Sequence, residues 1–362
     1  MGAGDLPGGW HRADLETDPG GLPAVTLPKV TVLMPVHNGL PYLERAVESI
    51  LRQTHAEFEL LVIDDASTDE SGAVLSAMRD PRIRLVRHER NMDLVATLNE
   101  GLDLAQGEYV ARMDQDDISL PERLEKQVAF LERHGDVGIV AAGARLIDGS
   151  DRPGAVLPLL AGHDLLRWSF CFGCPIAHAG VMMRRSLILE LGAYREEAFR
   201  CEDYDLWTRA AGKTRLAMIP EVLLHLRRHA SSMTRIWPED NVRNALRVAS
   251  AHIQTILGEE PPPGVLRTLW LQEVRDPADA TAAANWVGRL CDAMLSDPSL
   301  AFVERRGIRL DAAARLFMLF ANGISHPALW PALGRSLKMD PLVVARQAWS
   351  VTQRHFPGMA IS

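Results

Sequence analysis

Short apolar runs alternate with amphipathic stretches between residues 30 and 142. The runs are rich in Val, Ile and Leu, which favours buried strands. The stretches between them carry apolar residues at helical spacing, as in the predicted helices over residues 43–51, 95–105 and 121–134. Strands that alternate with helices form βαβ units, so this pattern predicts an α/β fold with a Rossmann-like, mostly parallel sheet flanked by helices. The predicted strands span residues 30–36, 58–63, 83–86, 109–113 and 137–142.

The pattern changes after about residue 238. Helical spacing runs from Val242 to Ile256, three prolines at 261–263 interrupt it, and helical stretches resume from residue 265 onward. The composition also shifts near Trp237–Pro238, from an acidic to a slightly basic chain. We therefore predict a flexible N-terminal tail over residues 1–28, an α/β domain over 29–237 and an α-helical C-terminal region over 238–362.

Composition and charge exclude several classes of protein. The 47 acidic residues exceed the 39 Lys and Arg, giving a net charge of -8, which argues against a protein that clamps nucleic acid phosphates. No run of about 18 apolar residues predicts a transmembrane helix, and the N-terminus lacks the basic start and apolar stretch of a signal peptide. Four cysteines provide no disulfide framework. We expect a soluble cytoplasmic protein.

Polar residues follow the predicted strands at the points where ligands bind in such sheets. His37 and Asn38 follow the first strand, Asp64 and Asp65 close the second, and the segment 114–117 reads Asp-Gln-Asp-Asp after the fourth. Carboxylates this close repel one another, and a divalent cation such as Mg²⁺ or Mn²⁺ relieves that repulsion. The pattern favours a metal–diphosphate site. The alternative is a helix-entry loop, because Asp caps helix N-termini.

A glycine-rich phosphate loop does not follow the first strand. The missing motif argues against two classes of protein, the dinucleotide-dependent dehydrogenases and the P-loop proteins. Bound phosphates would then depend on a metal ion for much of their charge neutralisation.

Three later segments carry further candidate chemistry. Glu202 and Asp203 precede a helical pattern, where a carboxylate could act as a general base or simply complement the helix dipole. His229 follows two arginines and could face a metal or phosphate, or be an ordinary loop histidine. Cys171 and Cys174 lie near a histidine, but a single CxxC is weak evidence for zinc, so buried free cysteines are the favoured interpretation.

Taken in order, these motifs resemble those of family 2 glycosyltransferases. The resemblance covers about residues 29–235. It implies a GT-A fold and an inverting, metal-dependent glycosyltransferase that uses a nucleotide sugar, with UDP-sugars expected first. A glycan or lipid-linked glycan acceptor in bacterial cell-surface polysaccharide synthesis would fit. The motifs that carry the resemblance lie at residues 30–39, 46–54, 58–69, 98–102, 105–117, 121–128, 178–185, 192–194 and 202–207.

On the donor side, the resemblance implies that Pro35, His37 and Asn38 border the nucleobase and ribose. Asp65 would hydrogen-bond the base, usually uracil. Many relatives carry Arg where this chain has Leu98, so an arginine contact to the donor from that position is lost. A Gly-Gly pair often found after Asn91 is replaced by Met-Asp.

The metal and acceptor residues are carried over in the same way. Asp116 would be the principal metal ligand (Mn²⁺ or Mg²⁺), Asp114 would bind ribose or metal, and His229 would be a further metal ligand. The acceptor side would hold Asp203 as catalytic base, with these residues beside it: Glu202, His178 and Arg185.

Other functions stay open at this point. A non-catalytic nucleotide-sugar binding or scaffold protein keeps the fold without the chemistry. A sugar nucleotidyltransferase shares the α/β architecture and the metal but uses a glycine-rich loop, and a hydrolase would release free sugar. The basic C-terminal helices could contact an anionic membrane surface at the inner face of the membrane, form a homodimer, or bind acceptor.

Overall fold

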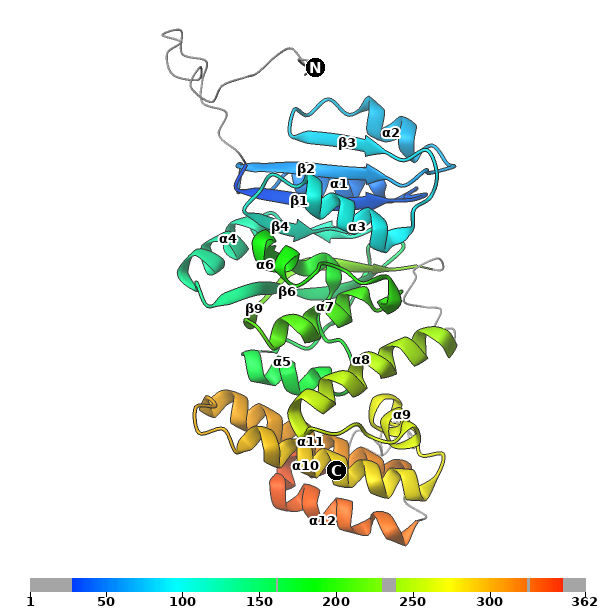
Figure 1. Ribbon diagram of the computed structural model, residues 1–362, viewed down its shortest axis with the longest axis vertical. Coiled ribbons are helices and arrows are strands. Elements are labelled where there is room, and N and C mark those ends of the chain that lie inside the picture. The colour runs from blue at the N-terminus through cyan, green and yellow to red at the C-terminus, as the bar shows by residue number, and fades with distance from the viewer. Residues whose placement is uncertain (1–27, 161, 230–238, 324–325, 348–362) are drawn as a thin grey trace, which may run out of the picture.

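The computed structural model describes residues 28–160, 162–229, 239–323 and 326–347. The expected boundary at Trp237–Pro238 and all but the last residue of the expected tail over 1–28 lie outside these residues. The strands are β1 (Val30–Val36), β2 (Phe58–Asp64), β3 (Ile83–Arg87), β4 (Tyr109–Arg112), β5 (Ile118–Ser119), β6 (Val137–Asp148), β7 (Pro153–Val156), β8 (Val181–Arg184) and β9 (Arg215–Arg228) (Figure 1). The helices are α1 (Leu43–Leu51), α2 (Ser71–Ala77), α3 (Asp93–Leu104), α4 (Arg123–Arg133), α5 (His163–Phe170), α6 (Arg185–Glu190), α7 (Glu202–Ala211), α8 (Glu239–Leu257), α9 (Pro263–Leu271), α10 (Pro277–Leu295), α11 (Phe302–Asn322) and α12 (Trp330–Met339).

One sheet joins the described strands in the order β3-β2-β1-β4-β8-β6-β9-β5, with β7 beside β6. The strands from β3 to β4 are parallel, as the βαβ pattern predicts. The second half is mixed, because β8 runs antiparallel to both β4 and β6, whereas β9 runs parallel to β6. Apolar periodicity identifies a strand but carries no information about its direction. The α/β fold is confirmed, with a mixed sheet.

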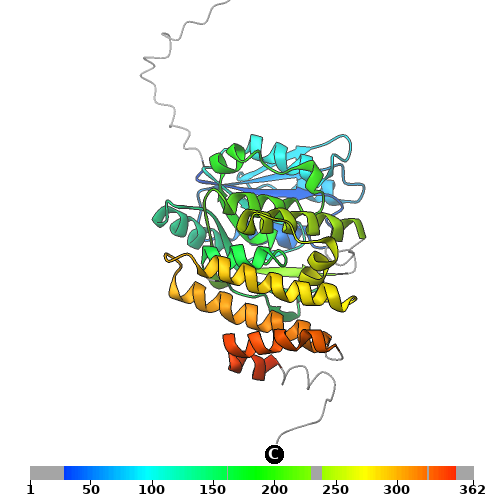
Figure 2. The ribbon, with the colours of Figure 1, turned by 60° about the horizontal axis from the view of Figure 1, so that its bottom comes forward.

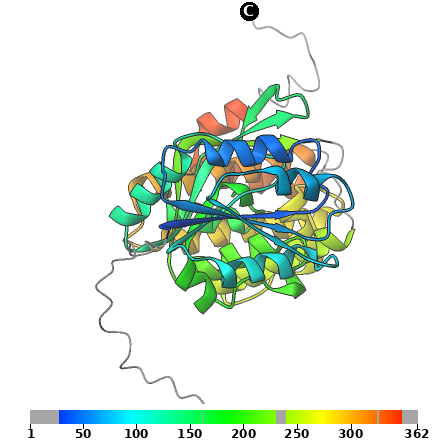
Figure 3. The same cartoon turned by 90° about the horizontal axis from the view of Figure 1, so that it is seen from above.

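Helices cover both faces of the sheet (Figure 3). Helix α1 buries Leu43, Ala46, Val47 and Ile50 against one face, together with apolar residues of α4. Helix α3 packs on the other face, where α5 and α7 join the same core. These apolar stripes are the ones that the helical spacing predicts.

The C-terminal helices pack on the end of the sheet domain (Figures 1 and 2). Their apolar residues belong to the same continuous core as α5, so that Leu166 and Leu316 share one cluster. A polar contact crosses the same interface, because the Trp168 indole N–H of α5 donates to Asp311 of α11 at 2.6 Å. Among the described helices, none is both long and apolar enough to cross a bilayer.

Strand register brings several strand ends to one edge. Val36 lies opposite Asp64, and Asp64 lies opposite Arg87 in the next strand. Arg112, the last residue of β4, lies opposite Leu33 of β1, so β4 ends toward the same edge. The residues that follow β1, β2, β3 and β4 therefore meet at this edge, which is where an open α/β sheet binds its ligand.

We expect Gly107→Ala to destabilise the protein. A Cβ at this turn would lie 2.4 Å from the backbone nitrogen of Thr31, and backbone cannot move aside as a side chain can. Overpacking of this kind costs about 1–3 kcal/mol. Gly135→Ala is the matched control, because a Cβ there meets nothing within 4 Å. Urea unfolding of both variants measures the difference, and equal stabilities would contradict the expectation.

Candidate active site

A cleft of about 590 Å³ lies over the edge where the strands end. It is lined by residues from the ends of β1, β2, β4 and β9 and from the start of α7. Every residue predicted for the site except Arg185 lines it. These residues are Pro35, His37, Asn38, Asp65, Asp114, Asp116, His178, Glu202, Asp203 and His229.

Arg185 lies at the other edge of the sheet. Strand β8 runs antiparallel to β4, with Arg184 opposite Tyr109 at the start of that strand. His178, which precedes β8, therefore lies at the cleft, whereas Arg185, which follows it, does not. The Arg185 guanidinium donates to the carbonyls of Leu102 and Asp103 at 2.7 and 3.0 Å and caps the end of α3. This corrects the expectation that Arg185 belongs to the acceptor side.

Gln115 locks the acidic loop to the end of β1. Its amide nitrogen donates to the carbonyl of His37 at 3.0 Å, and its amide oxygen accepts from the His37 backbone N–H at 2.9 Å. The neighbouring Asn38 adopts a positive φ of 52° and accepts from the backbone N–H of Thr68 at 2.8 Å. These contacts fix the loops after β1, β2 and β4 relative to one another.

Two carboxylates of the acidic loop contact different partners. Asp114 accepts from the buried guanidinium of Arg112 at 2.7 Å, and Asp116 lies 2.8 Å from the Nε2 of His229. Burial and the charge of Asp114 outweigh the His229 contact and raise the pKa of Asp116. Burial and both neighbouring charges raise the pKa of Asp117 well above its usual range. The loop therefore holds more negative charge than its own contacts neutralise.

The donor atoms at this loop fit a divalent cation that other ligands complete. Asp116 and His229 present carboxylate oxygen and imidazole nitrogen at the cleft, with Asp114 nearby. In the part of the chain that the structure describes, no three His, Cys, Asp or Glu side chains converge into a metal site on their own. Mg²⁺ and Mn²⁺ are bound by one or two carboxylates plus substrate phosphates. A site to which the protein contributes only some of the ligands agrees with this pattern.

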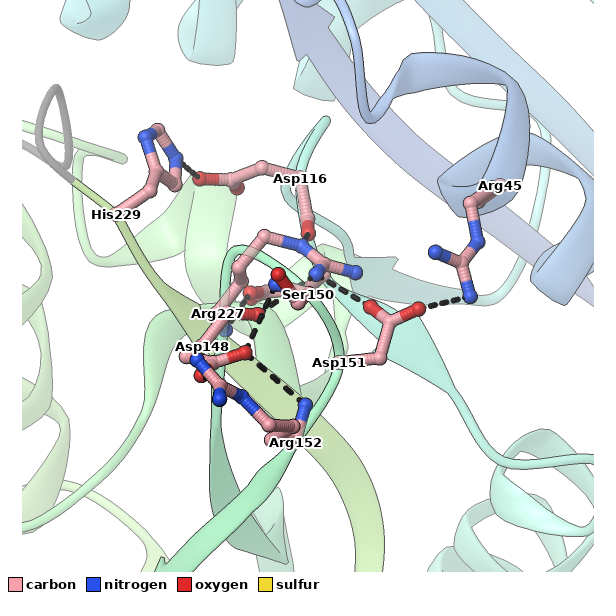
Figure 4. Close-up of polar contacts among 9 residues, drawn as sticks. Arg45, Asp116, Asp148, Ser150, Asp151, Arg152, Arg227 and His229 are labelled. Carbon is pink, nitrogen blue, oxygen red and sulfur yellow. Dashed lines mark hydrogen bonds and ion pairs between the residues drawn. The ribbon is translucent and has the colours of Figure 1, made fainter.

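Arg227 holds the wall of the cleft in place (Figure 4). Its Nε–H donates to the carbonyl of Asp116 at 2.7 Å, and its buried guanidinium also contacts the Asp148 carbonyl and the Asp151 carboxylate. Asp151 in turn pairs with Arg45 of α1. The hydrogen bonds from Arg227 and Arg45 outweigh burial and lower the pKa of Asp151. The hairpin of β6 and β7 is thereby tied to α1, to β9 and to the acidic loop.

Glu202 and Asp203 form the opposite wall, in the first turn of α7. Burial raises the pKa of Asp203 to about 6, against the lowering effect of a hydrogen bond from the Tyr204 backbone N–H. Burial and the charge of Asp203 raise the pKa of Glu202 to about 7. A carboxylate whose pKa lies close to neutral pH can accept a proton and later release it, as a general base must.

His178 is a neutral, oriented neighbour of these acids. Burial and the positive charge of Arg112 lower its pKa well below the usual range. Its Nε2 lies 2.9 Å from the Tyr194 hydroxyl, and Asn99 holds the backbone of Tyr194 through both its amide atoms.

The rim beside Asp203 combines an aromatic and a cationic side chain. Phe199 is 41% exposed, and the Arg200 guanidinium lies 5.2 Å from the centre of its ring. Asn241 of α8 also lines the cleft, so the C-terminal helices contribute to its wall. Helix α8 further holds this loop through Asn244, which donates to the Phe199 carbonyl at 3.2 Å.

Sequence reasoning missed several residues that organise the cleft. Arg112, Gln115, Arg227 and Asn241 line it, and His88 lies behind Asp65. Their position at or after strand ends could have pointed to Arg112, Gln115, Arg227 and His88, whereas Asn241 lies in α8 and had no such signal. The four cysteines are free thiols, and Cys171 is buried as expected, whereas Cys174 is exposed.

The sequence departs from the family pattern at Leu98 and at the Met-Asp pair after Asn91, and the structure places these residues differently. Leu98 is fully buried in the core, where an arginine would have no place. Asp93 adopts a positive φ of 68° and lines the cleft, at one of the positions where many relatives carry glycine. Asp tolerates this left-handed conformation better than most residues, and here it brings a further carboxyl group to the cleft.

Comparison with known proteins decides the family. The family model "Glycosyl transferase family 2" matches residues 31–192. The O-antigen biosynthesis glycosyltransferase WbnJ of Escherichia coli is 31% identical over 216 residues, which are 57% of this chain and 82% of WbnJ. The chain belongs to glycosyltransferase family 2.

Other relatives of this glycosyltransferase are similar in the same region. EpsE of Bacillus subtilis (strain 168) is 40% identical over 188 residues, which are 50% of this chain and 66% of EpsE. The amylovoran biosynthesis glycosyltransferase AmsE of Erwinia amylovora is 33% identical over 51% of this chain and 70% of AmsE. Two of these relatives thus carry polysaccharide biosynthesis in their names.

A solved structure confirms the GT-A fold. The crystal structure of S. aureus TarS 1-349 in complex with UDP-GlcNAc superimposes with a TM-score of 0.53 at 18% identity. The match covers 89% of this glycosyltransferase and 92% of the TarS chain, so it includes the C-terminal helices.

We expect Arg227→Lys to destabilise the protein by about 1.5–3 kcal/mol, the usual range for hydrogen bonds to charged groups. Lysine keeps the charge, but its single ammonium cannot bridge the Asp116 carbonyl and the hairpin at once. Arg152→Lys is the control, because Arg152 also contacts Asp148 but is 80% exposed (Figure 4). Urea unfolding measures both, and an equal loss in the two variants would contradict the role given to Arg227.

Proposed function

We propose that this protein is an inverting glycosyltransferase that moves a sugar from a nucleotide-sugar donor, with UDP-sugars first, to a hydroxyl group of a glycan acceptor. The observation that carries the proposal is the pairing of two features in one cleft. The acidic loop with His229 lies at the strand ends on one side, and the buried carboxylate of Asp203 lies on the other. The first suits a diphosphate and its cation, and the second suits a general base.

The donor would occupy the part of the cleft lined by the loops after β1 and β2. Pro35, His37 and Asn38 would border the nucleobase and ribose, with Asp65 on the base and Asp114 on the ribose or the metal. The TarS structure with bound UDP-GlcNAc supports a UDP-sugar, through a shared fold rather than close sequence similarity.

Asp116 and His229 would hold Mn²⁺ or Mg²⁺, with Asp114 as a further ligand. The cation, when bound, neutralises charge on the diphosphate and stabilises it as a leaving group. Asp116 is held by its backbone contact to Arg227, which fixes the loop before any ligand arrives.

Asp203 would perform the proton transfer. The acceptor hydroxyl attacks the anomeric carbon from the side opposite the diphosphate, and its proton passes to the Asp203 carboxylate. A new carbon–oxygen bond forms while the bond to the diphosphate oxygen breaks, and the bonding electrons leave with the nucleoside diphosphate. A single displacement inverts the anomeric configuration, so an α-linked donor gives a β-linked product.

The acceptor would bind on the side of Glu202 and His178. The exposed ring of Phe199 offers an apolar surface for the C–H face of a sugar, and Arg200 offers hydrogen-bond donors to its oxygens. The names of AmsE and WbnJ support a role in cell-surface polysaccharide synthesis. The protein would perform it in the cytoplasm or at the inner face of the membrane.

A thermal-shift screen tests the donor and the metal. We expect Mn²⁺ together with one class of nucleotide sugar to stabilise the protein, by about 2.7 kcal/mol at 100 times the Kd. UDP-, GDP-, dTDP- and CMP-sugars are compared with Mn²⁺ and with EDTA. Asp116→Ala should abolish the shift because it removes the principal metal ligand.

Asp136→Ala is the control for this screen, because Asp136 is an exposed carboxylate outside the cleft. A thermal shift with a nucleotide sugar that persists in EDTA would contradict the proposal that donor binding requires a metal ion. Donor binding without transfer to any glycan acceptor would favour a binding or scaffold protein instead.

Asp203→Asn should lower kcat by about 10²–10⁴-fold, the usual contribution of a general base, while donor binding is retained. Because burial raises the pKa of Asp203 to about 6, and only the carboxylate accepts a proton, kcat/KM of the wild type should rise as the pH increases through that value. Glu196→Gln, an exposed carboxylate outside the cleft, should behave as the wild type. A product with retained anomeric configuration, observed by NMR, would contradict the mechanism.

A further inference from the structure

His88 lies behind the donor side of the cleft and joins two carboxylates. Its Nδ1 is 2.7 Å from Asp65 Oδ1, and its Nε2 is 2.7 Å from Glu100 Oε2. The side chains of His88 and Asp65 are 10% and 6% exposed, whereas Glu100 is 43% exposed. The family pattern of the sequence does not include this histidine.

The backbone fixes the position of His88 before its side chain makes any contact. It follows β3 directly, and its backbone N–H donates to the Asp64 carbonyl at 2.9 Å, which extends the pairing of β3 with β2. Glu100 comes from α3, on the other side of the ring. The contacts therefore connect the end of β2, the end of β3 and a helix, and no single element can move without breaking one of them.

Asp65 is held by one oxygen only. Its Oδ1 accepts from His88 and, at 2.7 Å, from the backbone N–H of Met92. No hydrogen bond from the residues that the structure describes reaches Oδ2, and Asp65 lines the cleft. One oxygen is thus saturated by the protein, and the other is left to a ligand.

Electrostatics agrees with this geometry. An imidazole that contacts a carboxylate through each nitrogen must carry both N–H groups, and is then the cation. Burial lowers the pKa of His88, but the hydrogen bonds to Asp65 and Glu100 outweigh it and raise the pKa overall. The Asp65 carboxylate that contacts this cation can only accept hydrogen bonds.

We propose that His88, supported by Glu100, is a positioning residue that fixes Asp65 as an obligate acceptor and so selects a nucleobase that presents a ring N–H. This inference rests on the proposed function, in which Asp65 faces the base. Uracil, thymine and guanine carry such an N–H, whereas the corresponding ring nitrogen of cytosine is itself an acceptor and would face the carboxylate unfavourably. Selectivity then depends on a residue that does not touch the donor.

Calorimetric titration with UDP, dTDP, GDP and CDP, in Mn²⁺, tests the inference on the full chain. The wild type should bind at least one of the first three more tightly than CDP. His88→Ala should weaken binding of that preferred nucleotide by about tenfold, equivalent to about 1.4 kcal/mol, and leave CDP binding unchanged, so that the preference falls. In kinetics, the loss should fall on the KM for the donor and not on the KM for the acceptor.

Two further variants separate positioning from folding. His88→Gln retains one donor and should recover part of the preference, and Glu100→Gln, which keeps an acceptor for His88, should have a smaller effect than His88→Ala. His134→Ala is the control, since His134 is exposed and lies outside the cleft. Circular dichroism at the assay temperature confirms that each variant is folded.

The outcomes distinguish the two proposals. A wild type that binds none of these nucleotides overturns the donor assignment itself, and this inference with it. A wild type that prefers one nucleotide, with His88→Ala weakening that nucleotide and CDP equally or neither of them, overturns the role of His88 alone.

Discussion

The arrangement of the cleft follows from one electrostatic constraint, the cost of gathering carboxylates at a buried edge of the sheet. Asp114, Asp116 and Asp117 lie within four residues, and burial together with the neighbouring charges raises the pKa of Asp116 and Asp117. Arginines are buried around them. Arg112 pairs with Asp114, and Arg123 donates to the Arg112 carbonyl, with burial lowering the pKa of Arg123 to about 10. The acidic loop can therefore remain folded and still carry unneutralised charge toward a ligand.

The second wall of the cleft depends on packing. Helix α7 carries Glu202 and Asp203 in its first turn, and its apolar face, with Trp207, is part of the same core as α3, α5 and the C-terminal helices. Arg209, in the last turn of α7, pairs with Asp205 at 2.8 Å and donates to two carbonyls of the preceding loop, which holds the helix against that loop. The acids are thus presented by a helix that is buried on one side and anchored at its base.

Residue pattern and motif order predicted the parallel strands, their ends and nearly all of the acidic and imidazole groups of the cleft, because these lie directly after apolar strands. Strand direction could not be predicted, since a four-residue strand such as β8 reads the same in either sense. Strand β8 lies between His178 and Arg185, which places them at opposite edges of the sheet although they are close in sequence. His88 and Asn241 were not foreseen because they reach the site only when distant segments come together, and Arg112 was not foreseen because it lies inside an apolar strand.

The position of Asn241 bears on how acceptor specificity could diverge within this group of enzymes. Helix α8 supplies part of the cleft wall and also supports the loop that carries Phe199. A chimera that exchanges the C-terminal helices between two such enzymes would therefore exchange part of the cleft wall, on the side proposed for the acceptor, as well as a supporting module. New acceptor preferences could arise by changes in a region that carries no family motif, while the donor half stays the same.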